Sequence, residues 1–132
     1  SLLVARDTTQ SAFGSFWRGG AALPATPVYV NSAGALPVIN GDETFTLFNA
    51  AGTRIDGATI AMPASALSTV QRKDPCLAAG TSSSWTITAS SNATPGSGAG
   101  AGCAKGVVIN EFSDAAGTGN FVFEFVELHN DQ

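Results

Sequence analysis

The segment Val107–Asn130 constrains the fold more than any other part of the chain. Two runs rich in β-branched and aromatic residues, Val107–Phe112 and Phe121–Leu128, flank the turn-forming stretch SDAAGTGN, a pattern that predicts a β-hairpin or β-arch. Alternation in the second run places Phe121, Phe123 and Phe125 on one face, and Val122, Val126 and Leu128 on the other. Because both faces are apolar, we expect other parts of a sandwich to cover both sides, since an uncovered hairpin of this kind would aggregate.

Composition limits the chain to one weakly charged domain. With 132 residues it is long enough for one core but hardly for two. Charged residues make up 12%, well below the roughly 25% of average soluble proteins. The net charge is −4, and among the basic residues only Arg72 and Lys73 are adjacent, so there is no basic stripe to neutralise phosphates. The sequence therefore predicts no direct nucleic-acid partner, and it has no apolar run long enough for membrane insertion.

The two cysteines, Cys76 and Cys103, fit one disulfide bond in an oxidising compartment, with two buried free thiols as the alternative. Both lie in loop-like sequence rich in small residues, which favours the bridge. It would close a loop of about 26 residues and stabilise the fold by roughly 3–4 kcal/mol. Together with Ser1–Asp7, which starts directly as an apolar strand, this pattern predicts a segment of an exported protein, located outside the cell or on its surface.

Short strand patterns dominate the rest of the chain. Alternating apolar and polar residues predict Glu43–Asn49 as a half-buried strand and Thr53–Ile60 as its hairpin partner, with a bulge at Gly57. Nearby prolines allow Val28–Asn31 to be a strand only at a sheet edge. Thr8–Gly20 is too irregular to predict a helix, and its aromatic residues predict packing over one end of the core. Further strands are expected at Ser1–Asp7, Leu67–Arg72 and Ser84–Ala89. The fold class is all-β, a sandwich of about seven to nine short strands that the C-terminal hairpin completes.

Several motifs resemble those of lamin-tail domains, which occur in nuclear lamins and in many bacterial extracellular proteins. VVINEF followed by FEFVELHN is similar to the opening of such a domain. Its latter part is similar to SLLVARD, NGDETFTLFNAAGTRIDG, LSTVQRKDP, SSWTITA and the tag ATPG. The resemblance implies an immunoglobulin-like β-sandwich. It also implies a structural or targeting role, since bacterial relatives accompany nucleases and phosphatases.

The order of these motifs is displaced relative to the family. The opening hairpin comes last, the closing tag lies at Thr94–Gly96, and the stretch with a buried tryptophan that usually separates the ELxN and LLVA strands is missing. Three arrangements explain this order: a fragment of a tandem array, a circular permutant, or a hairpin that completes the sandwich of a neighbouring copy. Residues 1–96 then form the C-terminal portion of a sandwich, and residues 97–106 form a Gly/Ala linker with Cys103. Residues 107–132 form the opening hairpin of the same sandwich, a neighbouring copy or the next domain.

Residues that could carry chemistry are sparse. The lone histidine, His129, stands at a strand end and is typical of a surface residue, and no nucleophile motif or cofactor-binding loop is recognisable. We therefore expect no enzyme activity and no cofactor. Carboxylates in the final hairpin are weak candidates for binding Ca²⁺, but their spacing is not that of a calcium loop, so no metal is expected. These carboxylates are Glu111, Asp114, Glu124 and Glu127.

Two functional hypotheses follow from the sequence. The first is a non-catalytic, exported structural module of bacterial type. It packs through β-strand complementation against copies of itself or adjacent domains in a cell-surface assembly or filament. Its assembly residues would be Val107, Val108, Ile109, Phe112, Phe121, Phe123, Phe125, Val126 and Leu128. The alternative is a glycan- or nucleic-acid-targeting module of a secreted hydrolase, in which exposed aromatic residues such as Phe16 and Trp17 would contact the ligand.

Overall fold

A computed structural model describes residues 1–24, 27–64, 67–97, 106–117 and 121–132. Strands dominate these residues, accompanied by one short α-helix, α1 (Gln10–Trp17), and two 3₁₀ turns, η1 (Ser82–Ser84) and η2 (Ser90–Asn92). The first four strands are β1 (Leu2–Ala5), β2 (Val28–Asn31), β3 (Thr46–Phe48) and β4 (Arg54–Gly57). The remaining four are β5 (Ser68–Arg72), β6 (Trp85–Ala89), β7 (Val107–Ser113) and β8 (Phe125–Asn130).

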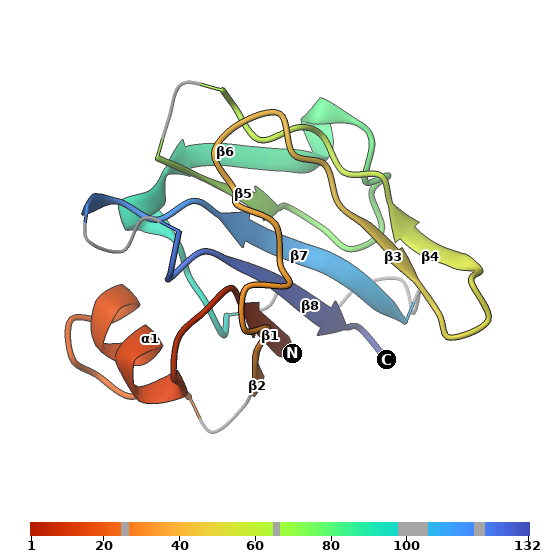
Figure 1. The fold of residues 1–132 in the computed structure, drawn as a ribbon. Helices are drawn as coiled ribbons and strands as arrows, with labels where there is room; N and C mark the ends of the chain where they lie inside the picture. The colour runs from red at the N-terminus through yellow and green to blue at the C-terminus, as the bar shows by residue number, and fades with distance from the viewer. Residues whose placement is uncertain (25–26, 65–66, 98–105, 118–120) are drawn as a thin grey trace.

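Six strands form one mixed sheet in the order β2-β1-β8-β7-β5-β6, with the C-terminal hairpin in its middle (Figure 1). Strands β1 and β2 are parallel and are connected through α1, whereas the other neighbours pair antiparallel. The hairpin β7–β8 thus pairs on both sides with strands of its own chain. β2 lies at an edge, as predicted from its prolines.

The hairpin β3–β4 forms a second, two-stranded sheet, which contacts β7 and lies in front of the large sheet in Figure 1. The two sheets give the mostly-β, sandwich-like arrangement that the sequence predicts. The register shift in this hairpin falls between Leu47 and Phe48 rather than at Gly57. Gly57 instead has a φ of 90°, and a Cβ there would lie 2.5 Å from the carbonyl oxygen of Phe45, so only glycine fits.

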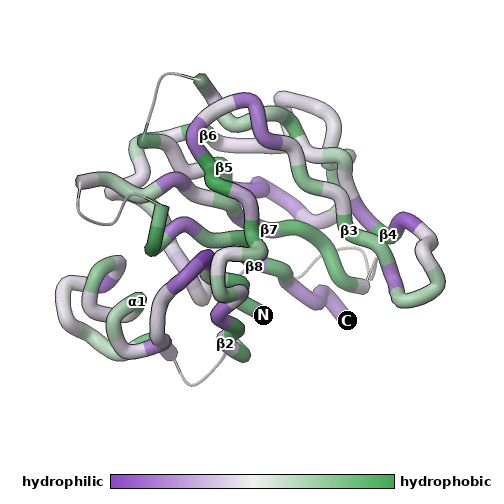
Figure 2. Tube along the Cα trace, viewed as in Figure 1, coloured by the Kyte–Doolittle hydropathy of each residue, from purple (hydrophilic) through white to green (hydrophobic). Residues whose placement is uncertain are grey.

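Other parts of the chain cover both faces of the large sheet around its middle strands, and the part of one face toward β2 stays exposed. The face toward β3–β4 holds the larger core, which includes the fully buried Phe112 and Val70. The opposite face holds a second core in which Phe13 of α1 packs with Leu3 and Phe125. Figure 2 shows a hydrophobic stretch along β7, in the middle of the large sheet. The hairpin is therefore covered on both sides, as the apolar pattern of its second run requires.

Two local expectations are wrong. Residues 10–17 form a helix, which Thr9 caps by accepting a hydrogen bond from the Ala12 amide at 3.3 Å. The helix does pack over one end of the core, as its aromatic residues indicate. Phe121 does not belong to a strand: its φ is 64°, its side chain is 45% exposed, and β8 begins only at Phe125. The turn ends later than the composition suggests because Phe121 donates its amide to the Glu124 carboxylate.

The predicted disulfide bond involves Cys103, which lies outside the described residues, so the bridge stays a prediction. Cys76 lies in an exposed turn in which its amide donates to the Asp74 carboxylate at 2.7 Å. Among the described residues, no helix has the length and apolar character needed to cross a bilayer.

Candidate functional site

The face of the large sheet toward β3–β4 is only partly covered. Leu2 lies opposite Val28 on one side and Leu128 on the other, and Val4 is flanked in the same way. Because residues directly opposite in neighbouring strands point to the same face, the register creates two aliphatic rows across β2, β1 and β8. The first row is Val28, Leu2 and Leu128, and the second is Val30, Val4 and Val126. Val28 is 68% exposed and Val30 is 41% exposed, so the rows run out into solvent.

An apolar groove of about 150 Å³ lies where these rows meet β3. Leu47 and Phe45 form one wall, and the second aliphatic row together with Ile109 contributes to the floor. β3 pairs with β4 along one edge, and within the described ranges no strand pairs with its other edge. A free strand edge therefore borders an uncovered apolar surface, a combination that accepts an added strand.

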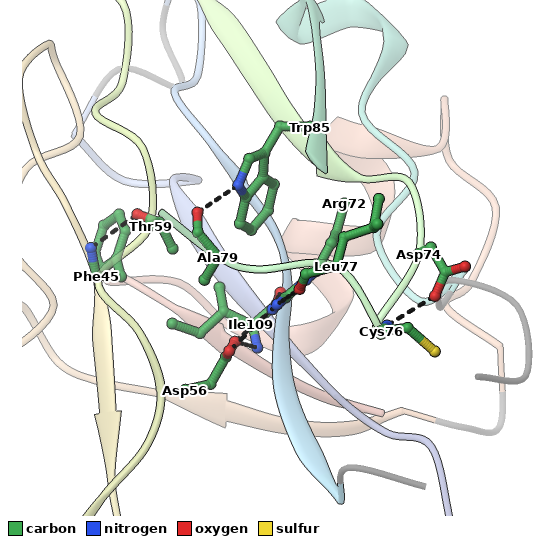
Figure 3. Close-up of polar contacts among 10 residues, drawn as sticks. All are labelled: Phe45, Asp56, Thr59, Arg72, Asp74, Cys76, Leu77, Ala79, Trp85 and Ile109. Carbon is green, nitrogen blue, oxygen red and sulfur yellow. Dashed lines mark hydrogen bonds and ion pairs between the residues drawn. The ribbon is translucent and has the colours of Figure 1, made fainter. Parts of the chain in front are cut away.

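A buried ion pair connects β4 to the large sheet (Figure 3). The Arg72 side chain on β5 is fully buried and pairs with the Asp56 carboxylate on β4, which also accepts the Ile109 amide at 2.8 Å. The guanidinium donates to the carbonyl oxygens of Leu77 at 2.6 Å and Ile109 at 3.1 Å, and it lies 5.3 Å from the Trp85 ring centre. This network holds the two-stranded sheet in place and so positions the wall of the groove.

Sequence reasoning missed this ion pair. Arg72 was visible as a charge at the end of an apolar strand pattern, and Asp56 as a charge within its hairpin strand. That signal marks each residue as unusual for a strand interior, but it does not say that the two meet across the sandwich.

On the opposite face, two buried glutamates hold the turn at Thr94–Gly96. Glu111 accepts hydrogen bonds from the Thr69 hydroxyl at 2.7 Å and the Thr94 amide at 3.0 Å. Its neighbour across β7–β8, Glu127, accepts the Gly96 amide at 3.0 Å. Burial raises the pKa of both carboxyls, that of Glu127 to about 7, and the Glu111 carboxylate adds to the shift at Glu127.

The other two candidate carboxylates of the hairpin, Glu124 and Asp114, lie elsewhere and also accept hydrogen bonds from backbone amides. Glu124 accepts the amides of Ile39 at 2.9 Å and Phe121 at 3.3 Å, while Asp114 accepts the Ala115 amide at 2.6 Å. Burial raises the pKa of both groups. Among the described residues, no group of three or more His, Cys, Asp or Glu side chains could hold a metal ion. The four candidates for Ca²⁺ thus do not converge on one site.

The proposed assembly residues of the hairpin occupy different environments. Most of them are buried in the two cores, namely Val108, Ile109, Phe112, Phe125 and Val126. Phe123 and Leu128 are partly buried against those cores. Val107 is 37% exposed and Phe121 is 45% exposed. The hairpin therefore contributes most of its apolar side chains to its own sandwich in this structure, and its surface toward a partner is small.

The predicted ligand-contacting aromatics lie at the C-terminal end of α1. The Phe16 ring stacks on Phe123 with 4.4 Å between centroids, and the Trp17 indole donates to the Phe123 carbonyl oxygen at 2.8 Å. Both side chains are half-buried. His129 lies apart from them, with Nδ1 3.2 Å from the hydroxyl of Ser1, where the two ends of the chain meet.

Comparison with known proteins identifies no relative. No protein-family model matches the chain, and no curated protein or solved structure is significantly similar to it.

Proposed function

We propose that the chain is a non-catalytic structural module, an immunoglobulin-like sandwich of the lamin-tail type, that assembles by receiving a β-strand from a second copy. The observation that carries the proposal is the pair of aliphatic rows beside the free edge of β3. Assembly outside the cell or on its surface agrees with the low charge of the chain and with the cysteine pair expected to form a bridge.

The displaced motifs support a lamin-tail arrangement. The strands that carry ELHN and LLVA, β8 and β1, are antiparallel neighbours. The Thr94–Gly96 tag packs beside the hairpin motifs through Glu111 and Glu127. Contacts of this kind between segments distant in sequence make one sandwich out of motifs in an unusual order.

The resemblance also suggests what fills the groove. The stretch that the family usually carries between the ELxN and LLVA strands contains a buried tryptophan. The groove borders both of these strands, through Leu128 and Val4, and its volume of about 150 Å³ is that of a cavity able to hold one aromatic ring. An extended segment with one aromatic side chain would therefore cover the floor and pair with β3.

The energetic gain from such a strand is substantial. Each large aliphatic side chain that becomes fully buried contributes roughly 1.5–3 kcal/mol to the free energy of association. The exposed side chains of Val28 and Val30 enlarge the apolar area that an added strand could cover beside the groove. Main-chain hydrogen bonds to β3 would fix the direction and register of the added strand. Copies related head to tail through this contact extend into a filament when the rotation between them does not close a ring.

Sedimentation velocity over a range of concentrations tests the proposal with a matched pair of variants. Val30→Lys places a charge at the end of the second aliphatic row, and Ile87→Lys places one at a 47% exposed site on β6, at the other edge of the sheet. We expect the wild type and Ile87→Lys to associate at high concentration and Val30→Lys to remain monomeric. A monomeric wild type, or association that only Ile87→Lys abolishes, contradicts the proposal.

The same structure gives less support to an arrangement in which one copy donates its β7–β8 hairpin to another copy. β7 and β8 are the central strands of the sheet, with β5 and β1 as their outer partners, so their removal would open both cores. Reception at β3 requires no such rearrangement. The experiment above separates the two modes, because an exchanged hairpin would leave the association of Val30→Lys unchanged.

A further inference from the structure

A second surface lies on the opposite side of the molecule, between the end of α1 and the segment 90–97. Two depressions of about 350 Å³ and about 290 Å³ flank the Trp17 side chain, which lines both of them. The other described residues that line them are mostly small or hydroxyl-bearing. They are Ala21, Ser90, Ser91, Ala93, Thr94, Pro95, Ser97 and Ala116, together with Phe16 and Arg18. Because Trp17 lines both depressions, they adjoin at this side chain, and the pair is called the Trp17 groove.

Both walls of this groove are fixed by contacts below the surface. The Trp17 indole is held by its hydrogen bond to Phe123 and by the rings of Phe13, Phe16 and Phe125, whose centroids lie 5.0–6.3 Å away. The facing wall is held by Glu111 and Glu127 through the amides of Thr94 and Gly96. A ligand would therefore meet a surface that loses little conformational entropy on binding.

Arg18 gives the groove its charge. Among the described residues that line the two depressions it alone is charged, and its side chain is exposed. The ion pairs found among the described residues use Arg6 and Arg72 instead. Its guanidinium is thus available for a ligand carboxylate at the end of the groove. A guanidinium can donate two parallel hydrogen bonds to the two oxygens of a carboxylate.

From this combination we infer that the groove binds an acidic oligosaccharide, with a sugar ring against Trp17 and a uronic-acid carboxylate on Arg18. The apolar face of a pyranose ring suits an indole, and sugar hydroxyls suit the serine and threonine wall. Nucleic acid fits less well, because one arginine in a chain of net charge −4 neutralises few phosphates. This site is separate from the groove at β3, which lies on the other face of the sheet.

Fluorescence titration tests the inference. The chain has two tryptophans, and Trp85 does not line the groove, so Trp85→Phe leaves Trp17 as the reporter. The probes are galacturonic-acid oligosaccharides, neutral maltose oligosaccharides and single-stranded oligothymidylate. We expect the acidic sugar to shift the emission of Trp17 and to protect it from acrylamide quenching, with an affinity that falls as salt is added.

A matched pair of charge reversals locates the site. Arg18→Glu should weaken binding of the acidic sugar about five-fold or more, since it replaces an exposed ion pair by repulsion. Arg54→Glu changes an exposed arginine on the β3–β4 hairpin by the same charge and should leave the affinity unaltered. Both positions are exposed, so circular dichroism should show wild-type folding.

Three outcomes overturn the inference: no binding of the acidic sugar, equal loss of affinity in both variants, or binding of oligothymidylate without binding of the sugar. None of these would affect assembly at β3, which sedimentation measures independently.

Discussion

At the scale of single residues, Asp56 and Arg72 show how a weakly charged protein uses a charge in its interior. Removing one partner of a buried ion pair leaves the other charge without compensation. We expect Asp56→Asn to lower the free energy of unfolding by about 3–5 kcal/mol, because Arg72 would stay buried and the acceptor for the Ile109 amide would weaken. Urea denaturation measures the change. The exposed Asp74→Asn serves as the control, and an equal loss in both variants would contradict the assigned role.

The glutamates under the Thr94–Gly96 turn predict an unusual pH dependence. Burial raises the pKa of Glu127 to about 7, above its ordinary value of 4.5, so between these values the folded state binds more protons than the unfolded state. The contribution of this group to stability should therefore be fully present below about pH 4.5 and be lost as the pH rises through about 7, a fall of about 3 kcal/mol. The raised pKa values of Glu111, Asp114 and Glu124 act in the same direction.

Thermal unfolding of Glu127→Gln as a function of pH isolates this contribution. The glutamine carries no charge at any pH, so we expect the fall in stability between pH 5 and pH 8 to become shallower. Asp7→Asn, an exposed carboxylate near the same end of the sheet, is the comparison. A slope in Glu127→Gln that equals the wild-type slope would show that Glu127 is not the group responsible.

At the scale of elements, the β3–β4 hairpin depends on one crowded glycine. Gly52 and Gly57 both have positive φ angles, but a Cβ at Gly52 would meet no atom within 4 Å, whereas one at Gly57 would lie 2.5 Å from the Phe45 carbonyl oxygen. Gly52→Ala should cost about 1–2 kcal/mol from backbone strain alone. Gly57→Ala should cost clearly more and displace the hairpin. Equal losses in chemical denaturation would contradict this explanation.

The elements also show what the sequence could predict. The strands of both hairpins follow from alternation and turn residues, which are local signals. The helix Gln10–Trp17 was missed because it is short and contains Gly14, which disfavours helices; its stability comes from packing Phe13 into a distant core. Phe121 was assigned to a strand because its neighbours in sequence are apolar, whereas Glu124 and Arg6 determine its position through its backbone.

The candidate site was less predictable than the fold. Its aliphatic rows arise from the pairing of β1 with β2 on one side and β8 on the other, and these contacts join segments from both ends of the chain. Nothing in the local sequence around Leu2, Val28 or Leu128 indicates that these residues are neighbours in the fold. The two aromatics at the end of α1 were recognised from the sequence, but their serine-rich counterpart across the groove was not, because its position depends on the buried glutamates.

At the scale of the whole molecule, the two sheets are unequal. The large sheet has six strands and its cover has two, so the side toward β2 remains open and apolar. A protein with few surface charges has little electrostatic repulsion to prevent copies from meeting at such a surface. The fold is therefore suited to association, while the opposite face, with α1 and the segment 90–97, stays available for a ligand.

Hydrogen exchange of the Thr46–Phe48 amides, measured at low and high protein concentration, tests the central claim most directly. If a strand of a second copy pairs with β3, exchange in this segment should slow markedly as the protein associates, while exchange in the β6 segment Trp85–Ala89 stays the same. Association that leaves exchange in β3 unchanged would contradict strand reception at this edge.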